Sequence, residues 1–106
     1  MPQTTTQAEI ERLERTALAE LTDLLSGAAV CRVPADRAVR AKHLEGRAAA
    51  LADLRRALAE PGAQLAAAIG QVDARWSSGP GGPLWDAYRT GGRQALAELA
   101  ASTAEG

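Results

Sequence analysis

The chain has no phenylalanine, one cysteine and one histidine among its 106 residues, and its only aromatic residues are Trp76, Trp85 and Tyr88. A single cysteine cannot form a disulfide within the chain. Cys31 and His43 together are also too few for a structural zinc site, which takes four such ligands. Because sheets favour β-branched and aromatic residues, this composition also disfavours a β fold. Domains built on a disulfide or on a structural zinc ion are therefore excluded, and sheet-based domains are disfavoured.

Long apolar runs are absent as well. No stretch approaches the roughly 18 apolar residues of a membrane-spanning helix, and the N-terminus lacks the basic patch and apolar run of a signal peptide. The net charge is −1, so the whole chain carries no strong attraction to nucleic acid. We therefore expect a cytoplasmic protein that makes no membrane contact.

The apolar content is 46% and comes mostly from alanine and leucine. Alanine has the highest intrinsic helix propensity and lets helices approach closely, so the composition indicates an all-α fold. The length is that of one domain, and we expect residues 1–106 to form a single helical domain.

The spacing of the apolar residues predicts four helices, at about 6–26, 34–59, 62–76 and 84–102. Thr6 and Glu9 form a capping-box pattern that places the start of the first helix there. The glycine- and proline-rich run at 77–83 is typical of a linker. Because short connections place successive helices side by side, we expect an antiparallel bundle of three long helices plus one short helix.

A partial internal repeat relates residues 41–54 to residues 86–99 at an offset of 45. Its glycines, Gly46 and Gly91, each precede an alanine by four residues. Glycine inside a helix costs roughly 1 kcal/mol relative to alanine, so matching glycines suggest notches through which another helix can pass. Chance matching in an alanine-rich chain is the alternative.

The charges are segregated along the chain. Residues 1–26 carry three more acidic than basic side chains, and residues 27–60 carry three more basic than acidic ones. Four arginines lie on or beside the leucine stripe of the second predicted helix: Arg37, Arg40, Arg47 and Arg55. They either pair with the acidic first helix or present charge to an acidic partner or to phosphates.

Two further features have competing interpretations. Trp76 and Trp85 bracket the linker and Tyr88 follows one turn later, so they either fill one end of the bundle or form a binding hot spot. Cys31 and His43 are the only candidate nucleophile and base, but no third residue is placed to orient the base, which favours simple packing roles. The sequence predicts no enzyme, no cofactor, no metal and no small-molecule substrate.

The phrase KHLEGRAAALADL, with its echo YRTGGRQALAEL, resembles a pattern in small helical proteins of tailed phages and related mobile elements of GC-rich bacteria. The resemblance covers about a quarter of the chain. It implies a non-enzymatic connector, completion or adaptor subunit, which would be assembled into a virion if the protein is phage-derived.

These features together favour a structural or protein-interaction subunit that forms an oligomer or part of a larger assembly. The expected partner-binding residues are Arg37, Arg40, Arg47, Gly46, Gly91, Trp76, Trp85 and Tyr88. The alternative is a small regulator that binds nucleic acid or an acidic partner through the basic second helix.

Overall fold

The computed structural model describes residues 2–26 and 35–105, with side chains described for 6–26 and 35–102. The described residues form four α-helices and no strand, which confirms the all-α prediction. The helices are α1 (Pro2–Leu25), α2 (Ala35–Leu58), α3 (Leu65–Trp76) and α4 (Pro83–Glu105). None of them combines the length and apolar character that crossing a bilayer requires.

Two predicted helix starts differ from the structure. The first helix begins at Pro2, so the capping-box prediction is wrong and Thr6 lies inside α1. Proline fits a first turn because the N–H it lacks would have no partner there. The third helix begins at Leu65 and not near residue 62, because Gly62 has a φ of 77° and Gln64 is extended. A left-handed residue cannot continue a helix.

The other boundaries lie closer to the prediction. The second helix matches to within one residue at each end, although Pro34, its expected first residue, lies outside the described residues. The fourth begins one residue early, again with a proline in its first turn, and continues three residues beyond the expected end at Ser102.

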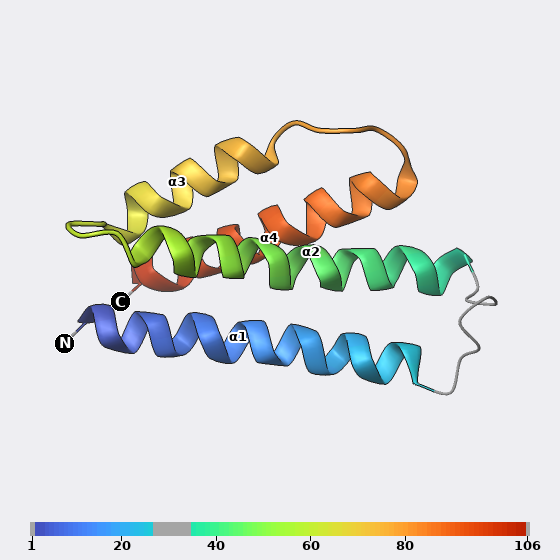
Figure 1. The fold of residues 1–106 in the computed structure, drawn as a ribbon, viewed down its shortest axis with the longest axis horizontal. Coiled ribbons are helices and arrows are strands. Elements are labelled where there is room, and N and C mark those ends of the chain that lie inside the picture. The colour runs from blue at the N-terminus through green and yellow to red at the C-terminus, as the bar shows by residue number, and fades with distance from the viewer. Residues whose placement is uncertain (1, 27–34, 106) are drawn as a thin grey trace.

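Successive helices reverse direction, and α2 lies at the centre of the fold (Figure 1). It packs against each of the other three helices, whereas α1 packs against α2 alone among the described helices. The most extensive interface joins α2 to α4, which passes behind α2 and runs in the same direction (Figure 1). The two most closely packed helices are therefore parallel, although each is antiparallel to its neighbours in the chain.

The core lies where α2 meets the other helices. Its most completely buried large side chains come from all four helices: Ile10, Leu51, Leu54, Leu96 and Val72. Each buried side chain of this kind stabilises the fold by about 1.5–3 kcal/mol relative to exposure. The predicted stripe of Leu44, Leu51 and Leu58 is buried throughout.

Candidate interaction site

The repeat glycines lie where the backbones of α2 and α4 touch. A β-carbon on Gly46 would overlap the carbonyl oxygen of Tyr88, and one on Gly91 would overlap the carbonyl oxygen of His43. Because Tyr88 and His43 occupy equivalent positions of the repeat, each copy supplies the same surface to the other. A helix does pack into the notch at each of these glycines, as predicted, and it belongs to the same chain. Gly46 and Gly91 are buried and cannot themselves contact a partner.

Polar side chains join α2 and α4 along one side of this crossing. His43 Nε2 lies 2.8 Å from Gln94 Oε1, and Arg47 donates to Glu98 at 2.8 Å. Arg47 is therefore engaged within the fold, and by α4 rather than by the acidic α1. Both pairs join residues 51 positions apart in the chain, so they hold α2 and α4 in one and the same register.

The other three arginines predicted to lie on or beside the leucine stripe of α2 divide into two kinds. Arg55 donates to Glu14 of α1 at 3.1 Å, which is the expected pairing between the basic and acidic segments. This bond and the negative charge of Glu14 raise the pKa of Arg55. Arg37 and Arg40 make no ion pair with any residue that the structure describes. They are the cations of α2 that remain available to a partner.

The aromatic residues form one cluster with unequal exposure. The Trp76 ring is buried and stacks on Tyr88 with ring centres 4.9 Å apart, while Trp85 meets the Tyr88 ring edge-on at 5.8 Å. The Trp76 indole N–H donates to Asp53 at 2.9 Å. Burial, together with the charges of Asp53 and Glu45, raises the pKa of Tyr88. Trp76 and Tyr88 thus pack at one end of the hydrophobic core. Trp85 is 49% exposed and is the aromatic residue of this cluster that a partner can reach.

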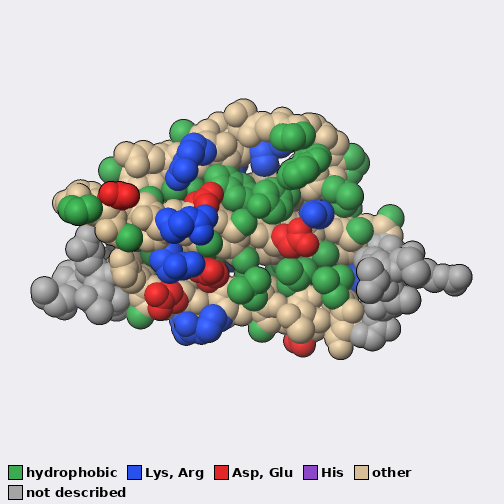
Figure 2. Space-filling view, in the orientation of Figure 1, with side chains coloured by type: hydrophobic (Ala, Val, Ile, Leu, Met, Phe, Trp, Pro, Cys, Tyr) green, Lys and Arg blue, Asp and Glu red, His purple; other side chains and the backbone are tan. Residues whose placement is uncertain are grey.

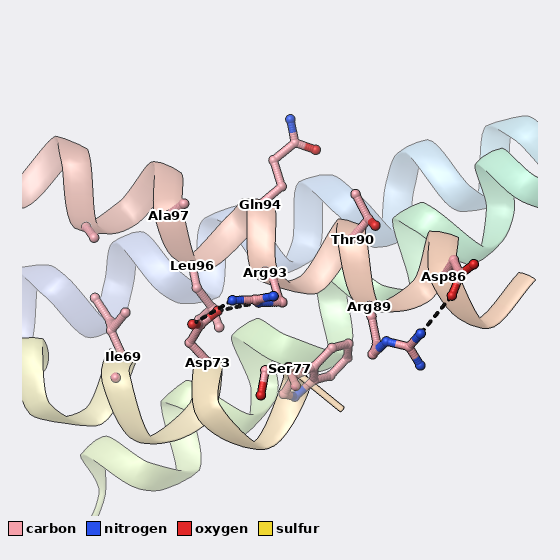
Figure 3. A pocket seen from close by; sticks show the side chains of 13 residues that line it. Ile69, Asp73, Ser77, Asp86, Arg89, Thr90, Arg93, Gln94, Leu96 and Ala97 are labelled. Carbon is pink, nitrogen blue, oxygen red and sulfur yellow. Dashed lines mark hydrogen bonds and ion pairs between the residues drawn. The ribbon is translucent and has the colours of Figure 1, made fainter. Parts of the chain in front are cut away.

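A cleft of about 770 Å³ lies between α3 and α4 (Figure 3). Arg93 donates two hydrogen bonds across it to Asp73, at 2.9 and 3.2 Å, and lowers the pKa of that carboxyl group. Arg89 pairs with Asp86 at the other end of the cleft. Its charged side chains are therefore paired with one another. No sequence motif marks the Asp73–Arg93 pair, which depends on how α3 and α4 pack.

Five large apolar side chains are exposed in the part of the chain that the structure describes: Leu18, Leu25, Val39, Leu84 and Trp85. Figure 2 shows hydrophobic side chains gathered over the beginning of α4 and over the second half of α1, with charged side chains between them. A sequence signal marks two of the five, because Val39 and Leu84 are 45 residues apart and each lies two residues before one copy of the repeat.

Neither a metal site nor a relative adds to this description. In the described ranges, no group of three or more His, Cys, Asp or Glu side chains is placed to hold a metal ion. Cys31, the candidate nucleophile, lies outside the described residues. Comparison of the chain with protein-family models, with curated proteins and with solved structures finds no match.

Proposed function

We propose that the chain is a structural or protein-interaction subunit, without catalytic activity, that acts in an oligomer or a larger assembly such as a phage-like particle. The exposed apolar side chains of α1, α2 and α4 carry this proposal. Each is more than a third exposed, although the chain is short of large apolar residues. Gathered exposed apolar residues mark interaction surfaces, since burying them against a partner removes them from water.

The side chains around the clefts support a non-catalytic role. Catalysis by side chains needs a nucleophile or a base that is free to reach a substrate. Asp73 and Asp86, in the cleft between α3 and α4, each pair with an arginine, and His43 is hydrogen-bonded to Gln94. An antiparallel set of three long helices and one short helix then acts as a scaffold that presents its outer faces, in the cytoplasm or in a virion.

The oligomeric state tests this proposal. Light scattering on the purified chain across the micromolar range should give a mass above that of one chain. If it does not, a tagged chain purified from its own cells should retain a protein partner in fixed stoichiometry, and replacing Leu84 and Trp85 by serine should weaken that retention. A chain that stays monomeric and retains no such partner would contradict the proposal.

The second candidate function is binding of nucleic acid or an acidic partner by Arg37 and Arg40. The observation in its favour is that these two arginines have no ion pair among the described residues, whereas Arg47 and Arg55 do. Fluorescence anisotropy with duplex DNA should then show binding that weakens steeply with salt. Replacing both arginines by alanine should abolish it, while Arg15→Ala, which removes an exposed arginine of α1, should not. The absence of binding at low salt would eliminate the nucleic-acid form of this function.

A further inference from the structure

A pocket of about 280 Å³ lies between the glycine- and proline-rich linker, the end of α3 and the beginning of α4. The linker runs from the end of α3 to the beginning of α4, past the first turns of α4 (Figure 1), and residues 78–80 form one wall of the pocket. Arg89 of α4 holds this wall in place by donating a hydrogen bond to the carbonyl oxygen of Pro80. We call this site the linker pocket. All three aromatic residues of the chain line it.

The aromatic rings give the linker pocket one open flat surface. Trp76 is buried and stacks on Tyr88 with ring centres 4.9 Å apart, which leaves no room for a third ring between them. Trp85 meets Tyr88 edge-on and is 49% exposed. The ring surface that a ligand can reach therefore belongs mainly to Trp85. An exposed aromatic ring of this kind is a platform on which another flat ring can stack.

The charges of the linker pocket leave one cation without a partner. The charged side chains that line it are Asp53, Arg75 and Arg89. Asp53 pairs with Arg56, and Arg89 pairs with Asp86. Arg75 is exposed and makes no ion pair with any residue that the structure describes. With these pairing partners counted, three guanidinium groups face two carboxylates, so the pocket has an excess of one positive charge.

This arrangement favours one class of ligand. A cationic ligand would meet Arg75 as a like charge, and Lys42 and Glu45, which act on Tyr88 from nearby, pair with each other at 3.0 Å. The volume lies just below the range of about 300–1,000 Å³ that is typical of sites for drug-sized molecules, so the pocket suits one ring system. A flat ring that carries a negative group matches both the open face of Trp85 and the unpaired charge of Arg75.

We propose that the linker pocket binds one unpaired nucleotide, whose base stacks on Trp85 and whose phosphate contacts Arg75. Proteins hold unpaired nucleotides by stacking their bases on exposed aromatic rings and by placing cations beside the phosphates. The nucleotide is either free or part of a single strand, and both sources share this chemistry. The site goes beyond the proposed function because it needs neither a second copy of the chain nor the arginines Arg37 and Arg40.

Intrinsic fluorescence tests the proposal, because Trp76 and Trp85 are the only tryptophans and both line the linker pocket. Adenosine monophosphate should change the tryptophan fluorescence in a saturable way at low salt. Adenosine, which lacks the phosphate, should bind more weakly. A labelled single strand of adenine nucleotides is then tested by fluorescence anisotropy. Tighter binding of the strand than of the monophosphate would identify a single strand as the source, and equal binding would identify a free nucleotide.

Two substitutions separate the stacking contact from the charge contact. Trp85→Leu should weaken binding at least about 5-fold and leave its salt dependence unchanged, because it removes the stacking surface alone. Arg75→Ala should weaken binding and also reduce its salt dependence, whereas Arg75→Lys should retain both. Leu84→Ser and Arg37→Ala are the matched controls, since each changes an exposed residue that does not line the pocket. Both controls should bind like the unmodified chain.

Three results would each overturn the proposal: no binding of either nucleotide probe at low salt, binding of adenosine as tight as that of the monophosphate, and unchanged binding by Trp85→Leu and Arg75→Ala. Circular dichroism checks that the variants are folded. If Trp85→Leu loses helicity, the exposed Arg75 variants decide the outcome. A chain that binds neither probe but retains a protein partner, which Trp85→Leu loses, would show that Trp85 contacts protein. The proposed function would then stand and the nucleotide site would be overturned.

Discussion

At the scale of single residues, two glycines decide how α2 and α4 meet. Gly46 and Gly91 bring a helix backbone against the carbonyl group of the facing helix, which no larger residue allows. The sequence predicted that both positions serve close helix packing, because they recur in the repeat and cost helix propensity. It could not predict the facing helix, since a notch in one helix is compatible with any neighbour.

We expect Gly46→Ala or Gly91→Ala to destabilise the fold by about 1–3 kcal/mol, which is typical when extra atoms are forced into a packed interior. The obstacle is backbone and not a flexible side chain, so the two helices must move apart. Urea unfolding followed by circular dichroism measures the change.

Gly70→Ala is the matched control. Gly70 lies within α3, and a β-carbon there meets no atom within 4 Å. This change should stabilise the chain by up to about 1 kcal/mol through helix propensity alone. Equal changes in the free energy of unfolding at Gly46 and Gly70 would show that the backbones of α2 and α4 do not touch at Gly46.

At the scale of helices, the repeat explains why α3 can be half as long as α1. The face of α2 that carries Arg55, which bonds to α1, continues through Ala41 and Ala48 at seven-residue intervals, and both alanines are buried. Adding 45 gives Asp86 and Arg93 on α4, which line the cleft beside α3. Charged side chains thus replace buried alanines on the second copy. This face of α4 can stay in contact with water, so a helix of 12 residues is long enough to cover the remaining apolar side chains.

The Asp73–Arg93 pair should make the packing of α3 on α4 depend on pH. Arg93 lowers the pKa of Asp73 below its ordinary value of 3.8, so the unfolded chain takes up this proton first as the pH falls. Stability from the pair is complete above the ordinary value and is lost as the pH falls through the lowered pKa.

We therefore expect the unmodified chain to lose more stability than Asp73→Asn between pH 5 and pH 2, as measured by urea midpoints on a series of buffers. The difference should be small, because the pair is partly exposed. Asp86→Asn is the comparison, since it removes the more exposed carboxyl group of the Asp86–Arg89 pair at the other end of the cleft. Identical pH profiles for Asp73→Asn and the unmodified chain would contradict the assigned role of the pair.

Helix boundaries were predictable where a breaker sets them and less so elsewhere. The run at 77–83 and Pro61 end helices near the expected positions. The start of α1 was mispredicted because a proline in the first turn competes with a capping box, and local sequence does not decide between them.

At the scale of the whole molecule, the all-α class followed from composition, but the arrangement of the helices did not. Among the described helices, α1 packs on α2 alone, and α2 and α4 pair in parallel; both features depend on contacts far apart in sequence. The candidate site behaved similarly. Arg37 and Arg40 have no ion pair among the described residues and Trp85 is exposed, whereas Arg47, Trp76 and both glycines contact groups within the chain that only the fold brings to them.

If the crossing of α2 and α4 holds the fold together, the chain should reassemble from two pieces. We expect fragments 1–60 and 61–106, each a pair of helices, to be weakly helical alone and to regain helicity when mixed. Gly46→Ala in the first fragment should impair reassembly, and Gly70→Ala in the second should not. Circular dichroism on the mixtures measures both. Fully helical fragments that do not associate would show that each pair is stable by itself.

The shared direction of α2 and α4 also has an electrical consequence. Their peptide dipoles add, so the positive ends of two helices of 24 and 23 residues lie at the same end of the molecule. Each begins with an aspartate in its first turn, Asp36 and Asp86. The opposing helices α1 and α3 have 24 and 12 residues and offset only part of this sum. The carboxylates of Asp36 and Asp86 lie at these positive ends, so the side chains that begin the two helices offset the charge that the added dipoles place at this end of the molecule.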